Sequence, residues 1–157
     1  MLAPQPHSKP VVSGEQVRRS LRYTREQIAE FARSTGDANP LHFDTVAAQR
    51  ARHGEIIASG QQTAGQMMGL AATYFSRDDD GCTREMLCLN FNFAFKAPIF
   101  AEQDIELSWI VGLVEWNSRM EGWICQVDGT ARVGGRPCVI GRGTMLVKSL
   151  GLSVPAA

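Results

Sequence analysis

The segment GDANPLHFD, residues 36–44, holds an acid and a base that could act together on one water molecule. Asp37 and His42 are five positions apart, which would place them about 140° apart on an ideal helix and on opposite faces of a strand. A turn can bring both side chains to one point, and Asn39 and Pro40 supply turn chemistry between them. An unperturbed imidazole titrates near ~6.5, so His42 can accept or give a proton near neutral pH. The segment therefore indicates an acid–base site on a loop, although the spacing also fits an Asx turn with an ordinary loop histidine.

A short amphipathic helix is predicted to end directly before this loop. Thr24 and Gln27 form a capping-box pattern, and Gly36 is a typical helix stop. Residues 45–52 could add one or two further helical turns after the loop. The helix stop thus places Asp37 at the start of an irregular segment.

A longer helix is predicted from Gln61 to about Phe75, where apolar residues recur at three- and four-residue steps. Glycines destabilise a helix interior unless they serve another purpose. Gly65 and Gly69, one turn apart, therefore predict that another element packs unusually close to this helix.

After residue 81 the hydrophobic pattern changes to alternation, which is typical of β-strands. The alternating segments are LCLNFNFAF, IELSWIVGLV, GWICQVDGTARV and CVIGRGTMLVKS, separated by short polar turns. Helices followed by a run of long antiparallel strands predict an α+β protein with the helices on one face of the sheet. We expect residues 1–20, rich in proline, to form a flexible arm, residues 21–150 to form one domain, and residues 151–157 to form a tail.

Composition excludes several function classes. Sixteen basic and sixteen acidic residues cancel, so the chain has no broad positive field for nucleic acid or anionic membranes. No apolar run reaches the ~20 residues of a membrane span, and no secretory signal is evident, so we expect a cytoplasmic protein. The four cysteines show neither a CxxC pair nor zinc-ligand spacing with the histidines, which predicts free thiols and no metal site.

Residues 23–60, YTREQIAEFARSTGDANPLHFDTVAAQRARHGEIIASG, resemble the hydratase segment of the MaoC-like dehydratases, which include the (R)-specific enoyl-CoA hydratases. The signature of that family has the form GDxNPxHxD. The order of elements is also similar: the signature, a glycine that opens a long helix, and then a strand that ends in an FKxP element, here FKAPIF. The resemblance covers about residues 21–110 and implies a hot-dog fold, a long antiparallel sheet wrapped around a central helix.

The resemblance also implies roles for particular residues. Asp37 and His42 match the catalytic pair, and Gly60 matches the residue whose N–H helps to hold the thioester oxygen. A glycine N–H at a helix start offers a donor and the positive end of the helix dipole. Ser59, which replaces a histidine of close relatives, and Asn39 are further candidates for substrate binding, although Asn39 could instead order the loop.

The implied function is hydration of a 2-enoyl thioester, or dehydration of a 3-hydroxyacyl thioester, with (R) specificity and a place in fatty acid metabolism. No cofactor is expected, because coenzyme A or acyl carrier protein arrives as part of the substrate. We expect a homodimer or a dimer of dimers, since long strands leave open edges. Two alternatives stay open: a thioesterase on the same fold, and a non-catalytic module that binds acyl thioesters. The sequence leaves open which of Asp37 and His42 is the acid.

Overall fold

The computed structural model describes residues 9–152 and contains one antiparallel sheet of five strands in the order β1-β3-β4-β5-β2. The strands are β1 (Gln16–Leu21), β2 (Cys82–Phe95), β3 (Ile105–Asn117), β4 (Gly122–Val133) and β5 (Arg136–Leu152). The helices are α1 (Arg25–Thr35), α2 (Thr45–Arg50) and α3 (Gly60–Phe75), with a 3₁₀ turn, η1 (Pro40–His42), between α1 and α2.

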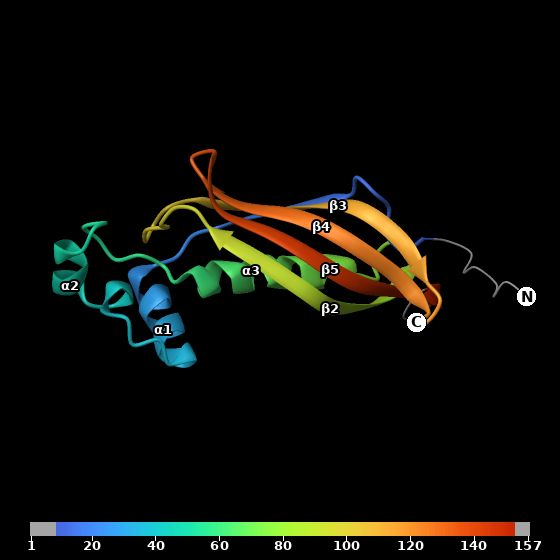
Figure 1. Ribbon diagram of the computed structural model, residues 1–157, viewed down its shortest axis with the longest axis horizontal. Coiled ribbons are helices and arrows are strands. Elements are labelled where there is room, and N and C mark those ends of the chain that lie inside the picture. The colour runs from blue at the N-terminus through green and yellow to red at the C-terminus, as the bar shows by residue number, and fades with distance from the viewer. Residues whose placement is uncertain (1–8, 153–157) are drawn as a thin grey trace, which may run out of the picture.

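The sheet curls over α3, which lies along its inner face, while α1 and α2 lie beyond the end where α3 begins (Figure 1). Helix α3 contacts all five strands. Helices therefore cover one face of a long antiparallel sheet, and the predicted α+β class and hot-dog arrangement are confirmed.

Helix α1, which leads into the loop that carries Asp37, begins and ends where the sequence predicts. The Thr24 hydroxyl accepts a hydrogen bond from the Gln27 backbone, and the Gln27 side chain accepts one from the Thr24 backbone, which completes the capping box. Gly36 ends the helix with a left-handed φ of 69°, a conformation that glycine adopts without a steric penalty. Asp37 is the first residue beyond that stop.

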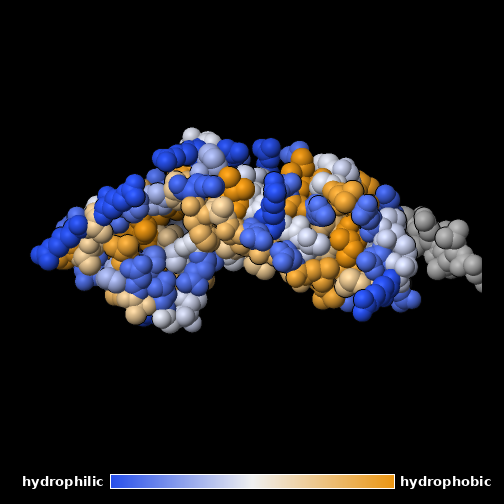
Figure 2. Space-filling model, in the orientation of Figure 1, coloured by the Kyte–Doolittle hydropathy of each residue, from blue (hydrophilic) through white to orange (hydrophobic). Residues whose placement is uncertain are grey.

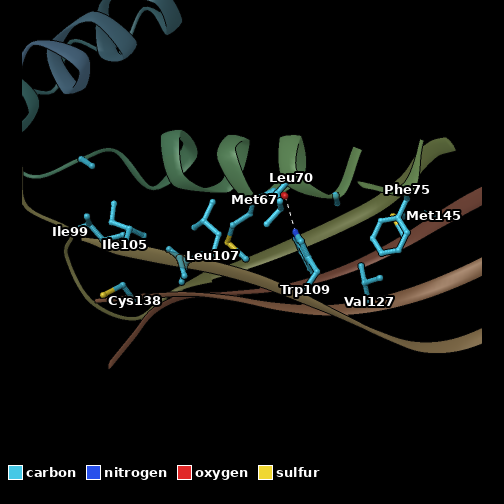
Figure 3. Close-up of a cluster of buried hydrophobic side chains, with 14 of the residues drawn as sticks. Met67, Leu70, Phe75, Ile99, Ile105, Leu107, Trp109, Val127, Cys138 and Met145 are labelled. Carbon is cyan, nitrogen blue, oxygen red and sulfur yellow. Dashed lines mark hydrogen bonds between the residues drawn. The ribbon is translucent and has the colours of Figure 1, made fainter. Parts of the chain in front are cut away.

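Trp109 of β3 connects the sheet to the central helix. Its side chain is 1% exposed, and its Nε1 donates a hydrogen bond to the Met67 carbonyl of α3 over 2.7 Å (Figure 3). The indole lies over Gly129 and Gly141, where an added Cβ would overlap its ring. These glycines give the largest buried side chain room between the sheet and α3.

Two expectations from sequence are wrong. Residues 16–20 are not an arm but part of β1, which pairs with β3, and Val11 is fully buried; residues 1–8 lie outside the described residues. Strand β1, QVRRSL, is short and mostly polar. It depends on its long-range pairing with β3, which the local sequence does not reveal. At the other end, β5 continues through Gly151 and Leu152, and the rest of the expected tail lies outside the described residues.

No element of residues 9–152 provides the expected close packing at Gly65 and Gly69. Both glycines are exposed, and an added Cβ at either would meet no atom within 4 Å of the described chain. The opposite stripe of α3, which includes Met67, Leu70 and Ala71, packs into the core instead.

The four cysteines are free thiols, as the sequence predicts. Burial raises the pKa of Cys125 to about 12, so this thiol stays protonated at neutral pH. Across residues 9–152, none of the helices has both the length and the apolar character that crossing a membrane requires.

Two glycine substitutions should change stability in opposite directions. Gly129→Ala should lower the free energy of unfolding by about 1–3 kcal/mol, because the new methyl group displaces the Trp109 ring. Gly65→Ala should raise it by about 0.5–1 kcal/mol, because alanine favours an exposed helix interior. Thermal and urea unfolding followed by circular dichroism would measure both. A loss of stability in Gly65→Ala would contradict the exposed setting of this glycine.

Candidate active site

The loop that carries Asp37 is fixed by hydrogen bonds of its own polar side chains. The Asp37 Oδ1 accepts from the Asn39 backbone N–H over 3.0 Å, and the Asn39 Oδ1 accepts from the Leu41 N–H over 3.2 Å. These Asx-type bonds start the η1 turn. Asp44 then accepts from two N–H groups at the start of α2 and so anchors the far end of the loop.

His42, the last residue of η1, is 5% exposed. Its Nδ1 lies 2.7 Å from the Ile57 carbonyl oxygen. A carbonyl can only accept, so this geometry assigns a proton to Nδ1 and leaves Nε2 of the neutral ring with a free lone pair. That Nε2 lies 3.4 Å from Asp37 Oδ2. The turn thus brings together the two side chains that the sequence singles out.

Ile57 holds this loop from the other side. Its N–H donates to the Leu41 carbonyl over 3.2 Å, and its carbonyl accepts from His42. Ile57 also forms a bridge with Phe100, and the next N–H, of Ala58, donates to the Ile99 carbonyl over 2.8 Å. The segment before α3 therefore joins the Asp37–His42 loop to the FKAPIF segment after β2.

A cavity of about 850 Å³ lies where these segments meet. Asp37 and His42 line it together with Ser59 and Gly60, and so does the FKAPI stretch, residues 95–99. Asn39 is not among its lining residues, and its Oδ1 accepts a hydrogen bond within the loop. The geometry thus gives Asn39 the loop-ordering role and does not support its selection as a substrate-binding residue.

Ser59 and Gly60 form the start of α3 at this cavity. The Ser59 Oγ accepts a hydrogen bond from the Gln62 N–H over 3.3 Å and caps the helix. Gly60 is the first helical residue, so its N–H has no acceptor within the helix and lies at the positive end of the dipole. An added Cβ at Gly60 would come within 2.6 Å of the Phe95 ring, so the ring packs directly on the helix start.

Sequence reasoning missed two polar side chains at this site. The Gln61 Nε2 donates to Asp37 Oδ2 over 3.2 Å. Thr63 is 1% exposed and lines the cavity, with its Oγ1 3.2 Å from the Tyr23 hydroxyl, and burial raises the pKa of Tyr23. The helical pattern marks both positions only as members of α3, and no local signal predicts their contacts.

Three basic residues and His53 also line the cavity, whereas Asp37 is the one acidic residue among the lining residues. They come from three distant segments: Arg52 and His53 follow α2, Lys96 follows β2, and Arg136 begins β5. Within residues 9–152, no group of three or more His, Cys, Asp or Glu side chains is arranged to hold a metal ion. The site therefore combines an Asp–His pair, a helix start and a basic lining.

Comparison with known proteins gives a family and a set of structural relatives. The family model described as "MaoC like domain" matches residues 8–122, which include most of the segment expected to be an arm. A search of curated protein sequences gives no match.

Several solved structures share the fold. The (R)-hydratase from A. caviae involved in PHA biosynthesis is 22% identical, with a TM-score of 0.76 over 88% of this chain and 98% of its own. The R-hydratase PhaJ1 from Pseudomonas aeruginosa is 18% identical, with a TM-score of 0.71 over 94% of this chain and 91% of its own. The C-terminally truncated HadBC complex from Mycobacterium tuberculosis, a 3R-hydroxyacyl-ACP dehydratase, is 19% identical, with a TM-score of 0.69 over 88% of this chain and 98% of its own. At these identities the likeness shows the fold alone.

The tautomer of His42 can be measured directly. We expect neutral His42 to carry its proton on Nδ1, because Nδ1 faces the Ile57 carbonyl. Long-range ¹H–¹⁵N correlation spectra of the imidazole rings would report this state. Exposed His53 serves as the internal control and should show the Nε2–H form that free imidazole side chains prefer. Finding Nε2–H at His42 would contradict the geometry of the pair.

Proposed function

Because the chain belongs to the MaoC-like domain family, we propose that it adds water to 2-enoyl thioesters, or removes water from 3-hydroxyacyl thioesters, at the Asp37–His42 pair. The observation that carries the proposal is the 3.4 Å separation of His42 Nε2 and Asp37 Oδ2 on the wall of one cavity. Such a pair can take a proton from one bound water molecule and return it to the substrate, which is general acid–base catalysis.

The hydrogen bond to Ile57 determines how this pair can bind water. With Nδ1 donating, neutral His42 and ionised Asp37 both present acceptors at Nε2 and Oδ2. Two acceptors this close repel each other unless a donor lies between them. A water molecule that donates one hydrogen to each satisfies both, and its oxygen lone pairs remain free to attack an electron-poor carbon.

In hydration, the water oxygen forms a bond to the β carbon while one of its protons passes to the pair. The π electrons of the double bond shift toward the thioester carbonyl, whose oxygen gains negative charge. A proton from the pair then reaches the α carbon, so Asp37 and His42 return to their starting states. Attack and protonation by one pair give addition from one face, and the face of the double bond that meets the pair sets the configuration. The likeness to two (R)-hydratases supports an (R)-configured 3-hydroxyacyl product. Dehydration is the same sequence in reverse.

The start of α3 supplies the group that stabilises the transient charge. The N–H of Gly60 is free of a helical acceptor, and Gly60 lines the cavity with the pair. A preorganised donor at the positive end of a helix is worth most where charge develops in the transition state. Ser59 contributes by capping this helix start.

The substrate arrives as a thioester of coenzyme A or acyl carrier protein, and the reaction needs no separate cofactor. Both carriers bear phosphate, and the basic residues Arg52, Lys96 and Arg136 on the cavity wall favour an anionic ligand. HadBC is a dehydratase of 3R-hydroxyacyl-ACP, which supports an ACP thioester as one of the two candidate substrates. Transformation of acyl chains of this kind belongs to fatty acid metabolism.

Removing either member of the pair should abolish most of the hydration without unfolding the protein. Asp37→Asn keeps the shape but loses the proton acceptor, and His42→Ala loses the imidazole. We expect each to lower the rate of hydration by on the order of a hundredfold or more. Loss of the conjugated absorbance of 2-enoyl-CoA esters measures the rate, and a melt of each variant checks the fold. Release of free thiol from saturated acyl-CoA, faster than any hydration, would replace this proposal with a thioesterase.

We further propose that the protein works as a homodimer or a dimer of dimers. The long edge strand β2 exposes Leu87, Leu89 and Phe95, and hydrophobic residues reach the surface over the strand-rich part of the molecule (Figure 2). Open edges and apolar patches of this kind favour association. HadBC is itself a complex, which supports assembly of related chains.

Assembly can be tested at this edge. Light scattering at micromolar concentration should give a dimer or a multiple of it, and Leu87→Lys with Leu89→Lys should shift the equilibrium toward monomer. Val46→Lys, an equally exposed apolar residue on α2, is the matched control and should leave the mass unchanged. A stable monomer of the unmodified protein would contradict the proposal.

A further inference from the structure

Gln61, the second residue of α3, reaches out of the helix to the carboxylate of Asp37. Its Nε2 donates to Asp37 Oδ2 over 3.2 Å, and both residues line the cavity. We infer that Gln61 is a positioning residue, which holds the Asp37 carboxylate in the orientation that presents Oδ2 to the reacting water. This inference rests on the proposed function, because it gives Gln61 a part in the same reaction.

The contacts of the two carboxylate oxygens support this role. Oδ1 accepts from the Asn39 N–H, a bond within the loop itself. Oδ2 meets His42 Nε2, which carries no hydrogen in the neutral ring, and the amide of Gln61. Among the hydrogen bonds of residues 9–152, Gln61 is therefore the one donor to Oδ2 while His42 is neutral.

The bond also spans two separate parts of the site. Asp37 lies on the loop after α1, and Gln61, 24 positions later, lies at the start of α3. Gln61 directly follows Gly60, whose N–H we assign to the thioester oxygen. The bond therefore fixes the spacing between the group that binds water and the group that binds the carbonyl oxygen. Misplacement of reacting groups by a fraction of an ångström to an ångström lowers rate strongly.

The chemistry of a primary amide suits this position. It is neutral, so it stabilises the carboxylate without competing with His42 as a charged partner, and it leaves a lone pair of Oδ2 for water. Methionine has a similar length and no donor. Glutamate would place a second carboxylate against Asp37 and repel it.

The kinetic test compares Gln61→Met with Gln66→Met. Gln66 lies on the same helix, accepts a hydrogen bond from Arg19 and does not line the cavity, so it controls for the loss of an exposed glutamine. We expect Gln61→Met to lower kcat about tenfold with little change in KM, because the thioester contacts persist while the carboxylate loses its orientation. Gln66→Met should keep both constants. A change in KM alone, or equal losses in the two variants, would overturn the inference.

A double-mutant cycle shows whether Gln61 acts through Asp37. In an Asp37→Asn background, Gln61→Met should cause no further loss of the residual rate, because the ionised carboxylate that it orients has been removed. A second tenfold loss in that background would mean that Gln61 acts elsewhere, and the inference would fail.

Nuclear magnetic resonance spectra test the hydrogen bond between Gln61 and Asp37 independently of hydratase activity. In ¹H–¹⁵N spectra, one proton of the Gln61 side-chain amide should be shifted by its bond to Asp37, and Asp37→Ala should return it to the position of a solvated amide. The Gln66 amide should not respond. If the parent protein hydrates no enoyl thioester, the proposed function fails, whereas an unresponsive Gln61 amide overturns the positioning role itself.

Discussion

The hydrogen bond between His42 Nδ1 and the Ile57 carbonyl is the constraint on which the site depends. It fixes the orientation and the tautomer of a buried ring, and so it makes Nε2 an acceptor that faces Asp37. Without this bond the ring would be free to turn or to carry its proton on the other nitrogen. The same Ile57 donates its N–H to Leu41, so one residue sets both the backbone of the loop and the chemistry of its histidine.

The rest of the fold keeps this arrangement in place. Ile57 is three residues before Gly60. The short segment that orients His42 therefore also places the start of α3 at the cavity. Trp109 holds α3 against the sheet through the Met67 carbonyl, and the glycines beneath its ring allow that close approach. The loop that carries Asp37 and His42 is thus supported by a helix that cannot shift without disturbing the core, which is the rigidity that a preorganised site requires.

Local signals predicted the parts of this structure that local interactions determine. The capping box, the stop at Gly36 and the change from helical to alternating periodicity all appear in the structure near their predicted residues. The Asp37–His42 contact was predictable because both residues lie in one short turn. Strand β1 was missed because its pairing with β3 is a long-range interaction, and the exposed Gly65 and Gly69 show that small residues in a helix need not mark a packed face. The contact of Gln61 with Asp37, and the basic residues that meet at the cavity from three segments, likewise depend on tertiary structure.

The central claim is that water bound by Asp37 and His42 attacks the β carbon of an enoyl thioester and not its carbonyl carbon. Incubation of the protein with an enoyl-CoA ester in water labelled with heavy oxygen, followed by mass spectrometry, tests this claim most directly. The account predicts that the label enters the 3-hydroxyl group of an intact 3-hydroxyacyl thioester. Label in a free carboxylic acid, released together with coenzyme A, would contradict it.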